Sequence, residues 1–133
     1  MAIALATPVK DVMLMAFANK IATQDGNGKL IFYGDSRPTG GVVITSQIKY
    51  AEASMPPPNP QNIRDGVYTV IGIPSTLVLA NGKTTWVRLV NGSGEWITDL
   101  NVGLSGSDAE VIVTDQDVLQ GGSIIVHSLT FRL

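Results

Sequence analysis

The stretch TLVLANGKTTWVRLVNGSGEWITDLNVG, residues 76–103, determines the fold class. Two turn signals divide it: Asn81-Gly82, a pair that accepts positive φ at both positions, and the longer NGSG run at 91–94. Branched and aromatic residues, which favour strands, fill the segments between the turns. The stretch therefore predicts three antiparallel strands joined by two turns.

Alternation along the second hairpin assigns its side chains to two faces. Pairing Val90 with Glu95 gives a first face that carries Thr85, Val87, Leu89, Trp96, Thr98 and Leu100. The opposite face carries Trp86, Arg88, Glu95, Ile97 and Asp99. We expect the first face to belong to the core and the second to be mixed, with the arginine near two acids.

The N-terminal part of the chain predicts a helix over residues 8–23. Thr7 suits the N-cap and Pro8 suits the first helical position. Helical spacing places six apolar residues on one stripe: Val9, Val12, Met13, Ala16, Phe17 and Ile21. Because Leu14 and Met15 lie outside that stripe, we expect the helix to be covered on two sides.

Strand signals dominate the remainder of the chain. We expect strands at 29–34, 42–50, 109–114 and 123–132, and a long proline-rich loop at 51–66, with four prolines in the five positions 56–60. One helix followed by many short strands is typical of an antiparallel sandwich or barrel. We predict a single domain over 1–133, mainly β, with a jelly-roll-like antiparallel β-sandwich at 29–133.

Composition limits the classes of partner. The 133 residues are 44% hydrophobic, enough for a core, and carry a net charge of -2 without a basic stripe, so nucleic acid is not an expected partner. The absence of cysteine excludes disulfides and thiolate sites. Lys10 and Asp11 interrupt the apolar start well short of a membrane span, so we expect neither a cleaved signal nor a membrane anchor.

The segment DSRPTGG, residues 35–41, raises the question of an anion-binding loop. A phosphate-binding loop leads into a helix N-terminus, whereas this segment lies between two predicted strands. Pro38 and the pair Gly40-Gly41 suit a chain reversal. We therefore interpret the segment as a turn that leaves Arg37 as an exposed contact.

No pattern of catalytic or metal-binding residues stands out. The only histidine, His127, shares a predicted strand face with Ile125, Leu129 and Phe131, so we expect it to be packed or at an interface. The acids near the C-terminus are Asp108, Glu110, Asp115 and Asp117, and Asp115 with Asp117 does not fit a calcium loop. We expect no catalytic residue, no cofactor and no metal.

Four segments in order carry a family resemblance: TPVKDVMLMAFANKI at 7–21, KLIFYGDSRPTGG at 29–41, TTWVRLVNGSGEWITDLNVG at 84–103 and GGSIIVHSLTFRL at 121–133. Together they resemble small virion proteins of tailed bacteriophages, and in particular capsid decoration or cement proteins. The proline-rich segment at 56–60 departs from that pattern. The resemblance implies a non-enzymatic protein on the capsid surface, made in the host bacterial cytoplasm, with the major capsid protein as its partner.

A stabilising role on a shell implies contacts with neighbours, and a homo-oligomer, by base rate a dimer, is expected. The residues that we predict for these interfaces are Met13, Leu14, Met15, Arg37, Met55, Pro56, Pro57, Pro58, Trp86 and Arg88. For the helix residues, a place in the core is the stronger alternative. Two other functions stay open: a tail-associated or receptor-binding module, and an enzyme that acts on polysaccharide through two carboxylates.

Overall fold

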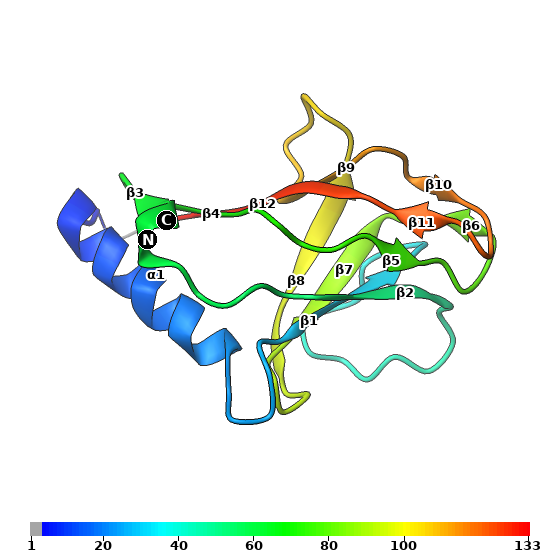
Figure 1. Cartoon of the computed structure of the whole chain (residues 1–133), viewed down its shortest axis with the longest axis horizontal. Coiled ribbons are helices and arrows are strands. Elements are labelled where there is room, and N and C mark those ends of the chain that lie inside the picture. The colour runs from blue at the N-terminus through cyan, green and yellow to red at the C-terminus, as the bar shows by residue number, and fades with distance from the viewer. Residues whose placement is uncertain (1–3) are drawn as a thin grey trace.

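The computed structural model describes residues 4–133 and is mainly β, with one α-helix and a curled sheet (Figure 1). Its elements are α1 (Thr7–Ile21), β1 (Lys29–Tyr33), β2 (Lys49–Ser54), the 3-10 helix η1 (Pro60–Asn62), β3 (Ile63–Arg64), β4 (Val67–Val70), β5 (Thr76–Leu77), β6 (Gly82–Lys83), β7 (Trp86–Val90), β8 (Trp96–Gly103), β9 (Val111–Val113), β10 (Asp117–Val118), β11 (Ser123–Ile124) and β12 (Val126–Arg132). The prediction of a mainly β chain with one N-terminal helix is confirmed.

Eight strands form one sheet in the order β2-β1-β7-β8-β9-β12-β4-β3. Every neighbouring pair is antiparallel except β8 and β9, which run parallel over two residue pairs. The two short pairs β5–β11 and β6–β10 lie outside this sheet. The jelly-roll arrangement that the sequence predicted is not confirmed.

The sheet curls far enough for β5 to reach the edge strand β2. The N–H of Leu79 donates to the carbonyl of Tyr50 at 2.7 Å, and the hydroxyl of Thr76 donates to the carbonyl of Glu52. β5 also pairs with β11, and β11 leads directly into β12. β5 therefore connects the edge strand β2 with the part of the sheet that contains β12. An exposed edge at β2 would be a site of unwanted strand pairing, and β5 covers it.

The core fills the inside of the curl. Its largest fully buried apolar side chains are Phe32, Leu30, Leu89, Ile124 and Leu129. As the alternation predicted, Val87 and Leu89 share the buried face with Leu100. Each fully buried side chain of this size stabilises the fold by roughly 1.5–3 kcal/mol relative to exposure.

The helix turns a different face to the core from the one predicted. Leu14, Ala18 and Ile21 are buried, whereas Val9, Val12 and Met13 are exposed. Two contacts fix this rotation: Asp11 Oδ1 accepts the N–H of Gly66 at 2.7 Å, and the ring of Phe17 meets that of Phe131 at 4.7 Å between centroids. The helix is apolar on nearly all sides, so its periodicity alone could not identify the buried face.

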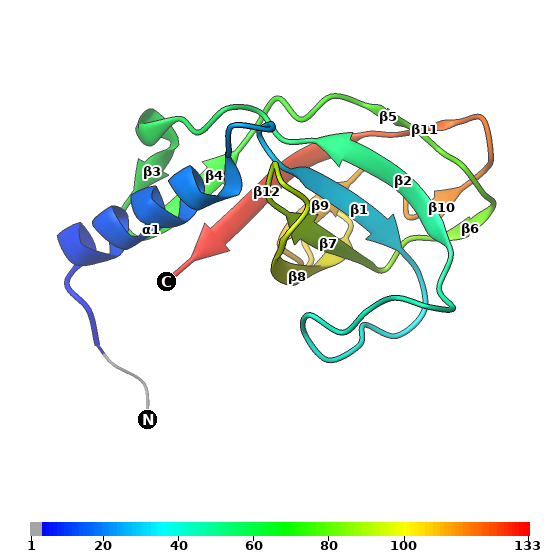
Figure 2. The same cartoon turned by 90° about the horizontal axis from the view of Figure 1, so that it is seen from below.

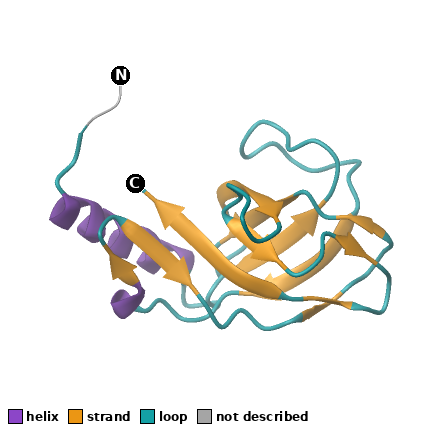
Figure 3. Ribbon diagram, turned by 90° about the horizontal axis from the view of Figure 1, so that it is seen from above, coloured by secondary structure: helices purple, strands orange, loops and turns teal. Residues whose placement is uncertain are grey.

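Both ends of the helix also differ from the prediction. Ala6 takes the N-cap position without a side-chain hydrogen bond, and Thr7 is already helical. The helix ends at Ile21, because Ala22 is extended and Thr23 pairs with Gly26 in a tight turn. Figures 2 and 3 show the helix at one end of the molecule, beside β3, β4 and the C-terminal end of β12.

One of the two predicted turns does not form a hairpin. The strands on either side of Asn81-Gly82 pair elsewhere, β5 with β11 and β6 with β10. The side-chain oxygen of Asn81 accepts the N–H of Gln120 at 2.8 Å, so this turn is tied to a distant part of the chain. The three-stranded antiparallel unit predicted for 76–103 is therefore reduced to the pair β7 and β8.

The hairpin between β7 and β8 forms with a register two residues away from the predicted one. Leu89 lies opposite Thr98, and a bulge after Leu89 pairs Val90 with Trp96. A shift of two residues preserves the faces, whereas the bulge moves Trp96 away from the core face. Trp96 is consequently exposed, although the sequence predicted it to be buried.

Two predicted boundaries around the second strand are wrong. The strand expected at 42–50 begins only at Lys49, and β2 continues to Ser54, inside the predicted loop at 51–66. Beyond Ser54 the loop is short, because η1 and β3 follow the prolines directly. Met55 is buried and its N–H donates to the carbonyl of Gly28 at 3.0 Å, which holds the start of the proline segment against the body.

Candidate functional site

A long loop between β1 and β2, residues 34–48, lies against the outer face of β7 and β8. Arg88 on β7 forms a two-pronged ion pair with Asp99 on β8, with N···O distances of 2.8 and 3.0 Å. The same guanidinium donates to the carbonyl of Val42 in the loop. Arg88 is only 8% exposed, so the ion pair is shielded from water and ties the loop to the sheet.

A second set of contacts holds both ends of this loop. The indole N–H of Trp86 donates to the carbonyl of Gly34 at 3.1 Å and to the side-chain oxygen of Gln47 at 2.8 Å. Gln47 in turn donates to the carbonyl of Ser36 at 2.8 Å. Trp86 also stacks on Tyr33 at 4.8 Å between centroids, and burial raises the pKa of that phenol.

The middle of the loop rests on Trp96. A side chain at Gly40 or Gly41 would meet the indole ring at 3.0–3.2 Å, so only glycine allows this close approach without displacement. The indole N–H donates to Asp99 Oδ1 at 3.1 Å, and Arg37 donates to the backbone carbonyl of Asp99 at 3.1 Å. The segment at 35–41 is thus an anchored turn, and Arg37 is exposed but engaged.

The anchored loop presents apolar side chains to solvent. We define the loop patch as Val42, Val43, Ile48 and Trp96. Val43 is the most exposed of these, at 77%. No charged residue lies between Arg37 and Lys49, so this part of the loop offers uncharged side chains only.

Exposed apolar residues also occur on α1 and on the β5–β11 pair, two elements that lie at opposite ends of the molecule (Figure 1). The helix patch consists of Val9, Val12 and Met13 on α1. The ribbon patch consists of Leu77, Leu79, Leu119 and Ile125 around the β5–β11 pair. In that pair Thr76 lies opposite Ile124, which points into the core. Because successive side chains point to opposite faces, Leu77 and Ile125 then face outward.

Four of the predicted interface residues are buried. Leu14, Met55, Trp86 and Arg88 lie in the interior, and Trp86 is only 1% exposed, so these residues cannot form a surface contact in this structure. Met13, Arg37 and Pro57 are exposed, and Met15, Pro56 and Pro58 are half-buried. For these six the interface role stays a prediction.

The sequence reasoning missed the loop patch and the ribbon patch. The available signal for the first was the uncharged run from Pro38 to Ile48, which was interpreted as a turn followed by a strand. For the second, Leu77 and Leu79 alternate with Val78, but both faces of that segment are apolar. When the side chains on both faces of a strand are apolar, the sequence does not show which face is exposed.

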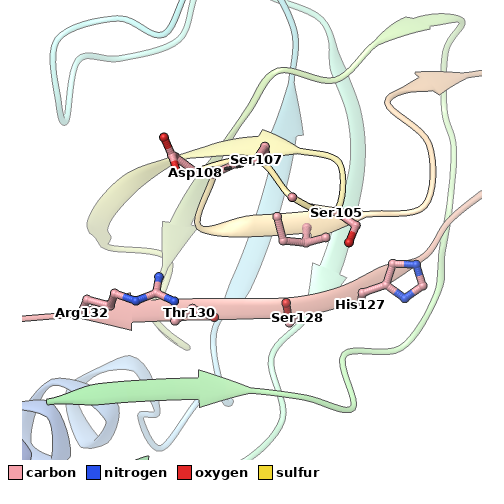
Figure 4. Close-up of a pocket in the computed structure, with 10 residues that line it drawn as sticks. Ser105, Ser107, Asp108, His127, Ser128, Thr130 and Arg132 are labelled. Atoms are coloured by element: carbon pink, nitrogen blue, oxygen red, sulfur yellow. Dashed lines mark hydrogen bonds between the residues drawn. The ribbon is translucent and has the colours of Figure 1, made fainter. Parts of the chain in front are cut away.

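A polar groove of about 750 Å³ lies between β12 and the loop at 104–110 (Figure 4). One wall carries His127, Ser128, Thr130 and Arg132 along β12, and the facing wall carries Ser105, Ser107 and Asp108. Figure 4 shows the labelled side chains of the two walls apart from one another, with His127 and Arg132 at opposite ends of the strand. The groove combines hydroxyls with one acid and one permanent cation.

His127 does not share the face of its neighbours on β12. The register between β12 and β9 shifts between Val126 and Ser128, so Leu129 and Phe131 are buried whereas His127 is exposed. Its Nε2 is 2.9 Å from the hydroxyl oxygen of Thr114. A histidine that is packed or at an interface was predicted. The register shift is the physical reason that His127 lies outside the core, and its role at an interface stays a prediction.

The acids near the C-terminus have local structural contacts. Glu110 Oε1 accepts the N–H of Asn101 at 2.9 Å, and Asp115 Oδ1 accepts the N–H of Asp117 at 3.0 Å. Within residues 4–133, no three His, Cys, Asp or Glu side chains lie together as a metal site requires. Over the same residues, no helix has the length and apolar character needed to cross a membrane.

No protein-family model, curated protein or solved structure matches this chain.

Proposed function

We propose that this chain is a non-enzymatic structural protein of a phage virion, a capsid decoration or cement protein that binds the major capsid protein and itself. The observation that carries the proposal is the presence of three separate apolar patches on a chain of 133 residues. Exposed apolar surface of this kind marks protein contacts. A subunit of a shell has several neighbours at once and needs several such surfaces.

The positions of the patches support this role. The helix patch on α1 and the ribbon patch around β5–β11 belong to elements at opposite ends of the molecule, and the loop patch belongs to the loop that connects β1 to β2 and to Trp96 on β8. Contacts at two ends of a subunit allow it to bridge neighbours rather than cap one of them. Many weak contacts repeated over a symmetric surface add avidity that no single contact supplies. A jelly-roll relationship for the β part remains a prediction within this proposal.

The alternative is a tail-associated or host-receptor-binding module, and the polar groove favours it. Hydroxyls with Asp108 and Arg132 offer donors and acceptors of the kind that glycans engage. Under this alternative, Asp108→Ala and Arg132→Ala should abolish attachment to host cells while leaving assembled particles intact. Normal attachment of both variants would remove its basis.

The copy number in purified particles separates the two functions. A decoration protein should give a gel band comparable in intensity to that of the major capsid protein, whereas a tail module should give a band weaker by more than about tenfold, since tails have far fewer symmetry-related positions. A weak band would contradict the proposed function.

Substitutions in the patches test the proposed contacts. Val12→Lys, Leu119→Lys and Val43→Lys each place a charge on an exposed position of a different patch, so the isolated fold should be retained. We expect each to weaken binding to particles that lack the protein. Ser105→Lys is the matched control, because it adds the same charge at an exposed position outside the patches. Normal binding of all three patch variants would contradict the assignment.

A further inference from the structure

We infer that Val43 and its neighbours in the loop at 34–48 pair with the same segment of a second copy, as a short antiparallel strand centred on Val43. The sequence GVVITS at 41–46 has a strong preference for strands, since branched residues dominate it. In this structure residues 42–44 run without a turn or bend but pair with no strand. A strand-forming segment without a partner in its own chain can obtain one from another chain.

The hydrogen bonds of Val42 determine which side of the segment is free. Its N–H donates to the carbonyl of Thr39 at 3.2 Å, and its carbonyl accepts from Arg88. Because a trans peptide bond directs the next N–H away from the preceding carbonyl, the N–H of Val43 faces away from Arg88. Among residues 4–133, neither backbone group of Val43 has a hydrogen-bond partner.

The anchors make the segment ready for pairing. The loop is held against the outer face of β7 and β8 by three side chains of these strands: Arg88, Trp86 and Trp96. A loop that is already held in its bound position loses less conformational entropy when it binds. The same contacts leave the side chain of Val43 directed to solvent.

The segment is complementary to itself. In an antiparallel pair centred on Val43 and limited to residues 42–44, Val42 lies opposite the partner's Ile44, and Ile44 lies opposite the partner's Val42. Branched side chains in direct cross-strand contact are favourable, and the pair brings no like charges together. A two-fold arrangement of this kind is the commonest symmetry of self-associating proteins, so we assign the second copy as the partner.

This inference rests on the self-binding part of the proposed function and makes no use of the capsid protein. Its test needs only the purified chain, whereas shell binding is tested on particles. Failure of the pairing and failure of shell binding are therefore distinguishable.

A single engineered cysteine provides the test, because the chain has none of its own. In the proposed pair the two Val43 residues exchange backbone hydrogen bonds, which places their Cα atoms about 5.5 Å apart, within the range for a disulfide. Val43→Cys under mild oxidation should therefore form a covalent dimer at least about tenfold faster than Ser105→Cys, since pairing raises the local thiol concentration. Ser105→Cys is the control, because it places a thiol at an exposed position outside the three patches.

Sedimentation of unlinked chains gives a second measurement. Val43→Pro removes the backbone donor that the pair needs, whereas Val43→Ala keeps it. We expect the wild type and Val43→Ala to show concentration-dependent dimers and Val43→Pro to stay monomeric. Equal cross-linking rates of the two cysteine variants, or dimers of Val43→Pro like those of the wild type, would overturn the inference.

Discussion

The loops at 34–48 and 104–110 both connect strands and both contain glycine and serine, yet they differ in what lies beneath them. Under the first, long side chains from the sheet reach the loop backbone: Trp86, Arg88 and Trp96. Under the second, the short side chains of Ser128 and Thr130 leave a hollow of about 750 Å³. The underlying sheet, more than the loop composition, decides which loop is held in place.

The difference has a functional counterpart. The anchored loop presents apolar residues in a fixed position, which suits a contact with another protein chain. The loop at 104–110, called the raised loop below, borders a polar groove, which suits small polar groups. In Figure 1 the loop at 104–110 stands clear above β9, and the loop at 34–48, which connects β1 to β2, lies on the opposite side, below β2.

The ion pair beneath the anchored loop should give the largest effect. Arg88→Ala leaves Asp99 buried without its partner and also frees the carbonyl of Val42. We expect a loss of about 3–5 kcal/mol in the free energy of unfolding, measured by urea denaturation, because breaking one partner of a buried pair leaves an uncompensated charge.

The matched control for this prediction is Arg37→Ala, which removes an exposed arginine from the same loop. We expect its cost to stay below about 1 kcal/mol, as for exposed pairs. Equal costs for the two variants would show that the buried pair does not hold the loop.

The second largest effect should be a loss of stability at alkaline pH, caused by Tyr33. Burial raises the pKa of Tyr33 above its ordinary value of 10.0, so the folded chain holds the phenol proton more tightly than the unfolded chain does. This contribution is fully present below pH 10 and is lost as the pH rises through the folded-state pKa. We expect the free energy of unfolding to fall by up to about 1.4 kcal/mol per pH unit above pH 10.

Tyr33→Phe removes the proton that this pH dependence requires. The variant should show a shallower decline above pH 10 than the wild type, with denaturation followed at a series of pH values. Because burial also raises the pKa of Tyr68, some decline should remain until Tyr68→Phe is added. An unchanged slope in Tyr33→Phe would show that this phenol does not contribute.

A pair of glycine substitutions compares the two loops directly. Gly41 and Gly106 have φ values of +78° and +91°, so alanine at either position costs about 1–2 kcal/mol of backbone strain. Only at Gly41 would the new methyl group meet the ring of Trp96, at 3.2 Å; nothing lies within 4 Å at Gly106. We expect Gly41→Ala, and not Gly106→Ala, to shift tryptophan fluorescence. Equal spectra would contradict the described packing.

The smallest effect should come from the floor of the polar groove. Ser128→Val and Thr130→Val replace a hydroxyl by methyl groups next to an open groove, so no packed neighbour needs to move. We expect changes within about 0.5 kcal/mol by thermal denaturation, as for other surface substitutions. A much larger loss would mean that the raised loop is packed against β12 after all.

Local patterns predicted the strands and faces that depend on near neighbours. The turn at 91–94 and the alternation of Val87, Leu89 and Leu100 were sufficient for the hairpin of β7 and β8. The bulge that exposes Trp96 was not predictable from the sequence. A bulge changes how two strands pair without leaving a signal in the alternation of either strand. The same holds for His127 on β12.

Features that depend on distant residues were missed. The buried face of α1 is set by Gly66 and Phe131, and Asn81 is tied to Gln120. The loop at 34–48 is held on the outer face of the sheet by Arg88 and Trp86, which lie 39 to 52 positions further on than the loop residues that they bind. The strand predicted over residues 42–48 therefore does not form, although branched residues dominate that segment.

The central claim, that the apolar patches join this chain to a virion shell, is tested most directly by locating the protein on intact particles. Gold-labelled antibody, raised against the purified chain and viewed by electron microscopy, gives that location. The account predicts label spread over the head at high density. Label confined to the tail, or particles without label, would contradict it.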